Sequence, residues 1–266
     1  MQQMILPSFP SYSRHDVSHS EAVIHNIELI LGEVNIRELS PTDCFVLLHT
    51  VYIHDIGMCI THEEKKEIFK EEAFHEYLEQ LQKESNSDMR YYASVLLKEC
   101  SKDTTEVHSK EDILNEKLEV YYAITYLLAE YRRKKHGDVS KDKLENWIDN
   151  PDKLGIGFST IQLPHRLFYI MAKCAATHTK WDFDEVLNLF QEDTGFVRDY
   201  VHPRFIAVLL QLGDALDMDN GRFHPLSKEY LGEFPATSKV HYGKHKSIRR
   251  LRITNEKLQI KILLNL

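Results

Sequence analysis

Histidines and aspartates recur in this sequence in line with apolar helix faces, where a folded core would bury them. Residues three, four or seven apart share one face of a helix. His19 precedes Val23 by four residues, and His178 follows Cys174 by four. Buried polar groups need partners, and one divalent metal can satisfy several of them at once. The residues that meet this criterion are His19, His54, His178 and Asp214, with Asp55 next to His54 at a predicted helix end.

Each of these residues has a plainer interpretation when it is considered alone. A single histidine on a core face is more often a hydrogen-bonded core residue than a metal ligand. Asp214 could equally cap a helix or pair with Arg204 or Arg222. Asp217 is interpreted as a solvated or capping residue. A shared metal centre is favoured because several separate helices send such groups toward the core.

The chain is predicted to be mainly α-helical, with a small C-terminal β-hairpin. Only ten of its 266 residues are glycine, and apolar residues recur with a helical period over most of its length. Ser40 as N-cap and Pro41 after it mark one helix start, and Gly57 marks its end. The alternating stretches SIRRLRIT and KLQIKILL predict the hairpin. Helices are expected at about 19–31, 40–57, 62–84, 89–100, 111–136, 162–178 and 202–217.

The change from helical to alternating pattern predicts two parts of the chain. Residues 1–235 are expected to form the helical domain, and residues 236–266 a hairpin appendage. An apolar strand that leaves an edge open needs a cover. We therefore expect the hairpin to pack on the helices, to lead into a further domain, or to meet a partner protein.

Composition restricts the class of substrate and the compartment. The 41 acidic and 33 basic residues give a net charge of −8, which disfavours a nonspecific duplex-binding surface. A small anionic substrate is compatible with this charge, because a bound metal supplies local positive charge. The four cysteines are scattered, the first residues do not have the pattern of a signal peptide, and the apolar runs are too short for a membrane span. A cytoplasmic protein is expected.

Three stretches, HSEAVIHNI, LLHTVYIHDIGM and VLLQLGDALDMDNGR, resemble the HD-domain metal-dependent phosphohydrolases, whose pattern is H…HD…D. Two further stretches, YRRKKHGDVS and CAATHTKW, resemble the additional histidines of a subgroup with the pattern H…HD…H…H…D. The resemblance covers roughly residues 12–225. The matching residues are His19, His54, Asp55, His136, His178 and Asp214.

The resemblance implies a helical bundle around one or two divalent ions. His19, His54, Asp55 and Asp214 are expected at the first ion, Asp55 as a bridge, and His136 and His178 at the second. Such a ligand set suits Mn, Fe, Co, Ni, Zn or Mg. Arg222 is the favoured phosphate-binding cation; the others considered are Arg14, Arg133 and Lys180.

The expected activity is hydrolysis of a phosphoester or phosphoanhydride of a nucleotide by metal-activated hydroxide. Asp55, His136, His178 and Arg222 are the predicted catalytic residues. Two alternatives stay open: a regulatory or binding module of a multidomain protein with weak or no catalysis, and a metal-dependent nuclease. A nucleic-acid partner is not favoured by the charge, and no membrane partner is expected.

Overall fold

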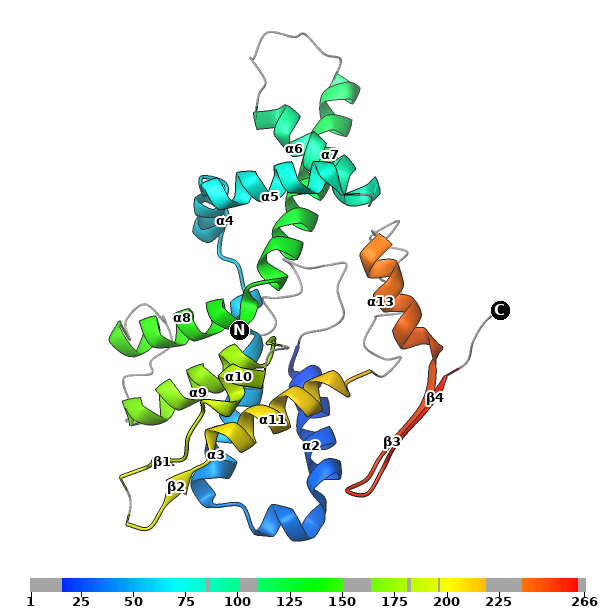
Figure 1. Cartoon of the computed structure of the whole chain (residues 1–266). Helices are drawn as coiled ribbons and strands as arrows, with labels where there is room; N and C mark the ends of the chain where they lie inside the picture. The colour runs from blue at the N-terminus through cyan, green and yellow to red at the C-terminus, as the bar shows by residue number, and fades with distance from the viewer. Residues whose placement is uncertain are drawn as a thin grey trace.

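The computed structural model describes residues 16–84, 87–100, 110–150, 164–180, 183–195, 197–218 and 236–262. The predicted fold class is confirmed, because the described residues are mainly α-helical and the C-terminal hairpin is present (Figure 1). The helices are α2 (Val17–Arg37), α3 (Pro41–Ile53), η2 (His54–Met58), α4 (His62–Ile68), α5 (Glu72–Lys83), α6 (Ser87–Cys100), α7 (Lys110–Arg133), α8 (His136–Asp149), α9 (His165–Thr177), α10 (Phe183–Leu187), α11 (Pro203–Ala215) and α13 (Ala236–Ser247).

Helix α3 begins where its sequence predicts and then changes form at the HD pair. The Ser40 side chain accepts a hydrogen bond from the Asp43 backbone N–H, and Pro41 occupies the first turn. The α-helix ends at Ile53, and the chain continues as the 3₁₀ helix η2. This tighter turn buries both His54 and Asp55, although neighbouring residues of a regular α-helix point about 100° apart.

Two of the predicted helices have different boundaries in the structure. The single helix expected at 62–84 is two helices, α4 and α5, separated at Phe69–Glu71 without a proline or glycine. Thr61 and Glu64 form a capping box that fixes the start of α4. The helix expected to reach residue 136 ends at Arg133, and α8 starts from His136 as a separate helix. Helices α10 and α13 and the short antiparallel pair β1 (Glu192–Asp193) and β2 (Tyr200–Val201) were also not predicted.

Two large apolar clusters form most of the core of the described residues, and η2 lies where they meet. Helices α4 to α7 surround one cluster in the upper part of Figure 1, with Phe74 and Leu127 fully buried. Helices α2, α3, α9 and α11 surround the other in the lower part. Met58 belongs to the first cluster and Val51 to the second. The segment that contains His54 and Asp55 is therefore held by packing on both sides.

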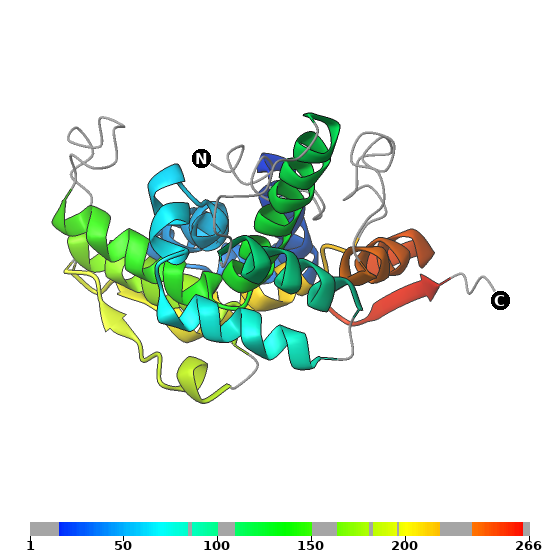
Figure 2. The same cartoon turned by 90° about the horizontal axis from the view of Figure 1, so that it is seen from above.

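The predicted hairpin consists of β3 (Ile248–Ile253) and β4 (Leu258–Ile262), which pair antiparallel. It lies with α13 at one end of the molecule in both views (Figures 1 and 2). The division of the chain at residue 235 stays a prediction.

Among the described residues no single helix is long and apolar enough to cross a membrane. The bent pair Pro41–Met58 and His62–Ile68 meets the length and composition criteria only when its two parts are taken together.

Candidate metal centre

Three of the predicted histidines share one local arrangement that orients their rings. The Nδ1 atom of each donates a hydrogen bond to the backbone carbonyl three residues earlier: His54 to Val51 at 2.7 Å, His136 to Arg133 at 2.7 Å, and His178 to Ala175 at 2.5 Å. A carbonyl oxygen only accepts, so the proton of the neutral ring is on Nδ1. The Nε2 lone pair of each ring is then free for a metal.

A fourth ring, that of His19, is oriented by a carboxylate instead. Its Nδ1 lies 2.6 Å from Oδ2 of Asp217, and both side chains are buried. The interpretation of Asp217 as a solvated or capping residue was therefore wrong. Helical spacing could not have found Asp217, because α11 ends at Ala215 and Asp217 lies in the turn after it.

Asp55 lies between two groups of ring nitrogens. Its Oδ2 is 3.5 Å from Nε2 of His19 and 3.3 Å from Nε2 of His54. Its Oδ1 is 3.3 Å from Nε2 of His136 and 3.4 Å from Nε2 of His178. One carboxylate thus faces two pairs of imidazoles, one pair with each oxygen.

Asp214 joins the first group from α11. Its Oδ1 is 3.4 Å from Nε2 of His19, and its side chain is 30% exposed, whereas that of His54 is fully buried. Burial opposes ionisation of Asp214, but the imidazoles of His54 and His19 hold its pKa below the usual range. The first group therefore has a carboxylate that is accessible from solvent and ionised at neutral pH.

The second group has two ring nitrogens in close contact. The Nε2 atoms of His136 and His178 are 2.9 Å apart, and both Nδ1 atoms already donate to carbonyls. Two lone pairs at this distance repel each other unless a proton or a cation lies near both. Burial alone would lower the pKa of His136, but its hydrogen bond to Asp55 raises that pKa above the usual value. Burial lowers the pKa of His178. Of the two rings, His136 is therefore the more basic.

The donor set fits divalent ions. Among the described residues, two groups of side chains have ligand atoms within 4.8 Å of one another, close enough to hold a metal ion: His19, His54 and Asp214, and His54, Asp55 and His178. Imidazole nitrogen with carboxylate oxygen suits Mn, Fe, Co, Ni or Zn better than Ca. Histidine ligands that hydrogen-bond through their other nitrogen are the usual arrangement in metal sites. The structure brings together all six side chains that the sequence selected.

Three glycines let the elements that contain these side chains approach one another. A Cβ on Gly57 would lie 2.0 Å from the backbone oxygen of His136. A Cβ on Gly137 would lie 2.7 Å from the carbonyl oxygen of Ala176, two residues before His178. On Gly213 it would lie 2.8 Å from Cγ1 of Ile27 on α2, the helix that contains His19. Each glycine precedes or closely follows a candidate ligand, so a side chain there would push two ligand-bearing elements apart.

Hydrogen bonds also fix η2 against α8. The Ser140 hydroxyl donates to the carbonyl of His54 at 2.5 Å and accepts from the N–H of Gly57 at 2.8 Å. Ser140 is fully buried and was not selected from the sequence. It therefore holds the HD pair in register with the helix that begins at His136.

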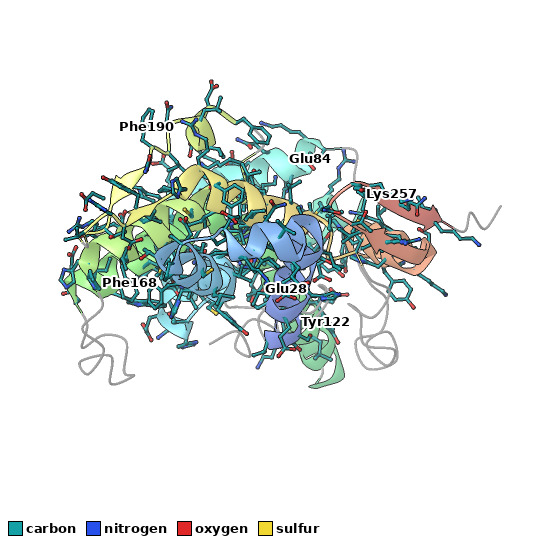
Figure 3. The ribbon with its side chains drawn as sticks, turned by 90° about the horizontal axis from the view of Figure 1, so that it is seen from below. Glu28, Glu84, Tyr122, Phe168, Phe190 and Lys257 are labelled. Carbon is teal, nitrogen blue, oxygen red and sulfur yellow. The ribbon has the colours of Figure 1, made fainter. Side chains whose placement is uncertain are left out.

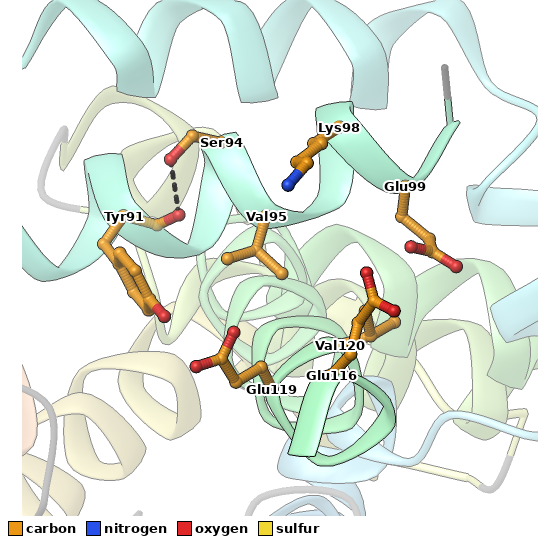
Figure 4. A pocket seen from close by; sticks show the side chains of 8 residues that line it. All are labelled: Tyr91, Ser94, Val95, Lys98, Glu99, Glu116, Glu119 and Val120. Carbon is orange, nitrogen blue, oxygen red and sulfur yellow. Dashed lines mark hydrogen bonds between the residues drawn. The ribbon is translucent and has the colours of Figure 1, made fainter. Parts of the chain in front are cut away.

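Two of the four candidate phosphate-binding cations are described by the structure, and both are in ion pairs with acidic side chains. Arg133 pairs with Glu130, and Lys180 pairs with Asp138 and Glu185. Arg14 and Arg222 lie outside the described residues. A pocket of about 290 Å³ between α6 and α7 contains none of the predicted site residues; Tyr91, Lys98, Glu116 and Glu119 are among its lining side chains (Figure 4).

Comparison with known proteins agrees with this geometry at the level of the family. The family model HD-CE matches residues 9–264, nearly the whole chain, including the hairpin. No curated protein and no solved structure shows significant similarity to this chain. The family match is of the HD type, as the sequence motifs predicted; the subgroup pattern with two additional histidines stays a prediction. The chain belongs to the HD-CE family.

Proposed function

We propose that this protein is a divalent-metal-dependent phosphohydrolase that cleaves a phosphoester or phosphoanhydride bond of a nucleotide. The observation that supports it most is the position of Asp55, with one carboxylate oxygen toward His19 and His54 and the other toward His136 and His178. A carboxylate between two imidazole pairs can bridge two ions, and paired ions are a recurrent device of phosphoryl-transfer sites.

The roles of the side chains follow from their geometry. His19, His54, Asp214 and Oδ2 of Asp55 would hold one ion, and Oδ1 of Asp55 with His136 and His178 would hold the other. Bound ions would supply Lewis acidity for activating water and for stabilising charge on the transferred phosphoryl group. The carbonyls of Val51, Arg133 and Ala175 keep three rings in the ligand tautomer.

The substrate would approach the centre where its side chains meet solvent. Asp214 is 30% exposed and His136 is 14% exposed, whereas His19, His54, Asp55 and His178 are at most 5% exposed. In this proposal Arg222, eight residues after Asp214, binds the substrate phosphate. The negative net charge favours a small nucleotide over a long nucleic acid, and a cytoplasmic location stays a prediction.

The experiment is a hydrolysis screen of nucleotides and single-stranded nucleic acids with the protein loaded with Mn, Co, Ni or Mg. We expect turnover that is lost in His54→Ala and Asp55→Ala. His49→Ala is the matched control, because His49 is exposed on α3, the helix that precedes the HD pair, and its Nδ1 also bonds to a backbone carbonyl, that of Phe45. Bound metal without turnover on any substrate would favour the regulatory module, and turnover that survives both substitutions would refute the proposed site.

A further inference from the structure

The charges of the chain are distributed unevenly. Residues 236–262 contain eight lysines and arginines and one acidic residue, Glu256, a net charge of +7. Since the whole chain carries −8, the remaining residues carry −15. Arg252, Lys257 and Lys261 are exposed, and none of them forms an ion pair with another residue in the described part of the chain. This end of the molecule therefore presents uncompensated positive charge (Figure 3, Lys257).

The hairpin has two different faces. Leu251 pairs with Ile260 and Ile253 with Leu258, while Arg252 pairs with Gln259 between them. Side chains alternate between the faces of a strand. The hairpin's apolar face therefore consists of Leu251, Ile253, Leu258, Ile260 and Ile262, and its basic face includes Arg252, Gln259 and Lys261.

The apolar face is covered on β3 and open on β4. Ile253 is 6% exposed, whereas Leu258, Ile260 and Ile262 are 49%, 41% and 55% exposed. Within the described residues β4 pairs with β3 alone, so its outer edge has no strand beside it. An open edge with large aliphatic side chains is a template for an added strand.

The hairpin is held against the body of the protein by its turn. Gly32 has a φ of +69° inside α2, and a Cβ there would lie 3.4 Å from the Asn255 side chain of the turn. A residue with this φ is strained unless it is glycine. The non-helical Gly32 thus lets α2 and the hairpin turn meet, which fixes the direction of β4 in advance of binding (Figure 1).

We propose that the outer edge of β4 binds an extended acidic segment of a partner protein as a third strand. Alternate apolar side chains of that segment would cover Leu258, Ile260 and Ile262, and its acidic side chains would lie on the face of Lys261. Strand addition gains affinity from main-chain hydrogen bonds and specificity from alternate side chains. Charge complementarity selects an acidic segment.

Two other occupants fit less well. A second copy of the hairpin has the same positive charge, so pairing β4 with β4 would place like charges close together. A single-stranded nucleic acid would use the basic face, but residues 248–262 contain no aromatic side chain on which a base could stack. It would also leave the aliphatic side chains of β4 exposed.

The test uses the full chain and a fluorescent capped nonapeptide that alternates glutamate with valine. A peptide with lysine in place of glutamate is the charge control. By fluorescence anisotropy, we expect the acidic peptide to bind at least about tenfold more tightly than the lysine peptide. Ile260→Asn and Lys261→Glu should each weaken its binding about three- to tenfold. Val197→Asn and Lys66→Glu, both at exposed positions outside the hairpin, should leave it unchanged.

Lys261→Glu keeps the proposal testable if Ile260→Asn unfolds the hairpin, because it changes only an exposed charge. Three results would overturn the proposal. The first is no binding of the acidic peptide up to about 1 mM, or equal binding of both peptides. The second is a dimer of the free chain that Ile260→Asn abolishes, which would identify a second copy as the occupant. The third is a single-stranded oligonucleotide that displaces the peptide and whose own binding is unchanged by Ile260→Asn.

Discussion

Replacing Asp217 by asparagine should weaken metal binding without removing a metal ligand. Asp217 accepts the Nδ1 proton of His19 at 2.6 Å and so holds its Nε2 toward Asp55 and Asp214. Asparagine keeps the shape but loses the charge that strengthens this hydrogen bond. Loss of such an outer partner typically weakens metal affinity by about 10- to 100-fold, or about 1.4–2.7 kcal/mol.

The same change should appear in stability measurements. Metal at a concentration about 100 times its dissociation constant stabilises a protein by about 2.7 kcal/mol. If affinity falls 10- to 100-fold, the stabilisation at that concentration falls to between about 1.4 and 0.4 kcal/mol. Denaturant unfolding with and without Mn²⁺ measures both numbers, and calorimetric titration measures the affinity directly.

Asp43→Asn is the matched control. Asp43 is a buried carboxylate that accepts hydrogen bonds from the backbone N–H and Nδ1 of His202, both at 2.8 Å, and it is not among the candidate ligands. This variant should lose stability with or without metal and should bind Mn²⁺ like the unaltered protein. An unchanged Mn²⁺ affinity in Asp217→Asn would refute the argument that Asp217 orients His19 for metal binding.

Three further substitutions test the packing of the two clusters and one charged group outside the ligand set. Gly57→Ala places a Cβ 2.0 Å from the oxygen of His136; it should cost about 1–3 kcal/mol in denaturant unfolding and lower the bound metal measured by elemental analysis. Phe74→Ala should cost about 3–5 kcal/mol in unfolding but leave the metal content of the folded protein unchanged, because Phe74 lies in the α4–α7 cluster. Burial opposes ionisation of Glu64, but hydrogen bonds from Thr61 and Lys143 hold its pKa below the ordinary 4.5. Since that pKa is lowered in the folded state, Glu64→Gln should lower the free energy of unfolding by about 1–2 kcal/mol near neutral pH. Unfolding curves should show that the two proteins become equally stable as the pH falls from 4.5 through the lowered pKa. A loss of stability that persists at lower pH would contradict the charge argument.

The convergence of the site could be predicted from the sequence because burial and helical period act locally. His19, His54, His178 and Asp214 each lie on an apolar face, and that alone sends their side chains inward. His136 rested mainly on the resemblance. It begins α8 at a break after Lys135, where neither proline nor glycine marks the end of α7. The break depends on tertiary packing: Gly57 has no side chain, so the backbone at the start of α8 can lie directly against it.

Asp217 and Ser140 could not be selected with the same criterion. Asp217 lies after the end of α11, so its direction depends on the turn that follows the helix. Ser140 is buried because η2 and α8 are close together, which is a contact between segments 83 residues apart. The break between α4 and α5 likewise has no strong local signal, and helical period alone continues through it.

The most direct test of the account is the position of metal in a crystal of the Mn²⁺-loaded protein. An anomalous difference map should show two peaks, one toward His19, His54 and Asp214 and one toward His136 and His178, with Asp55 between them. A map with no peak among these side chains, or with Mn²⁺ bound only elsewhere on the surface, would contradict the claim that they form a shared metal centre.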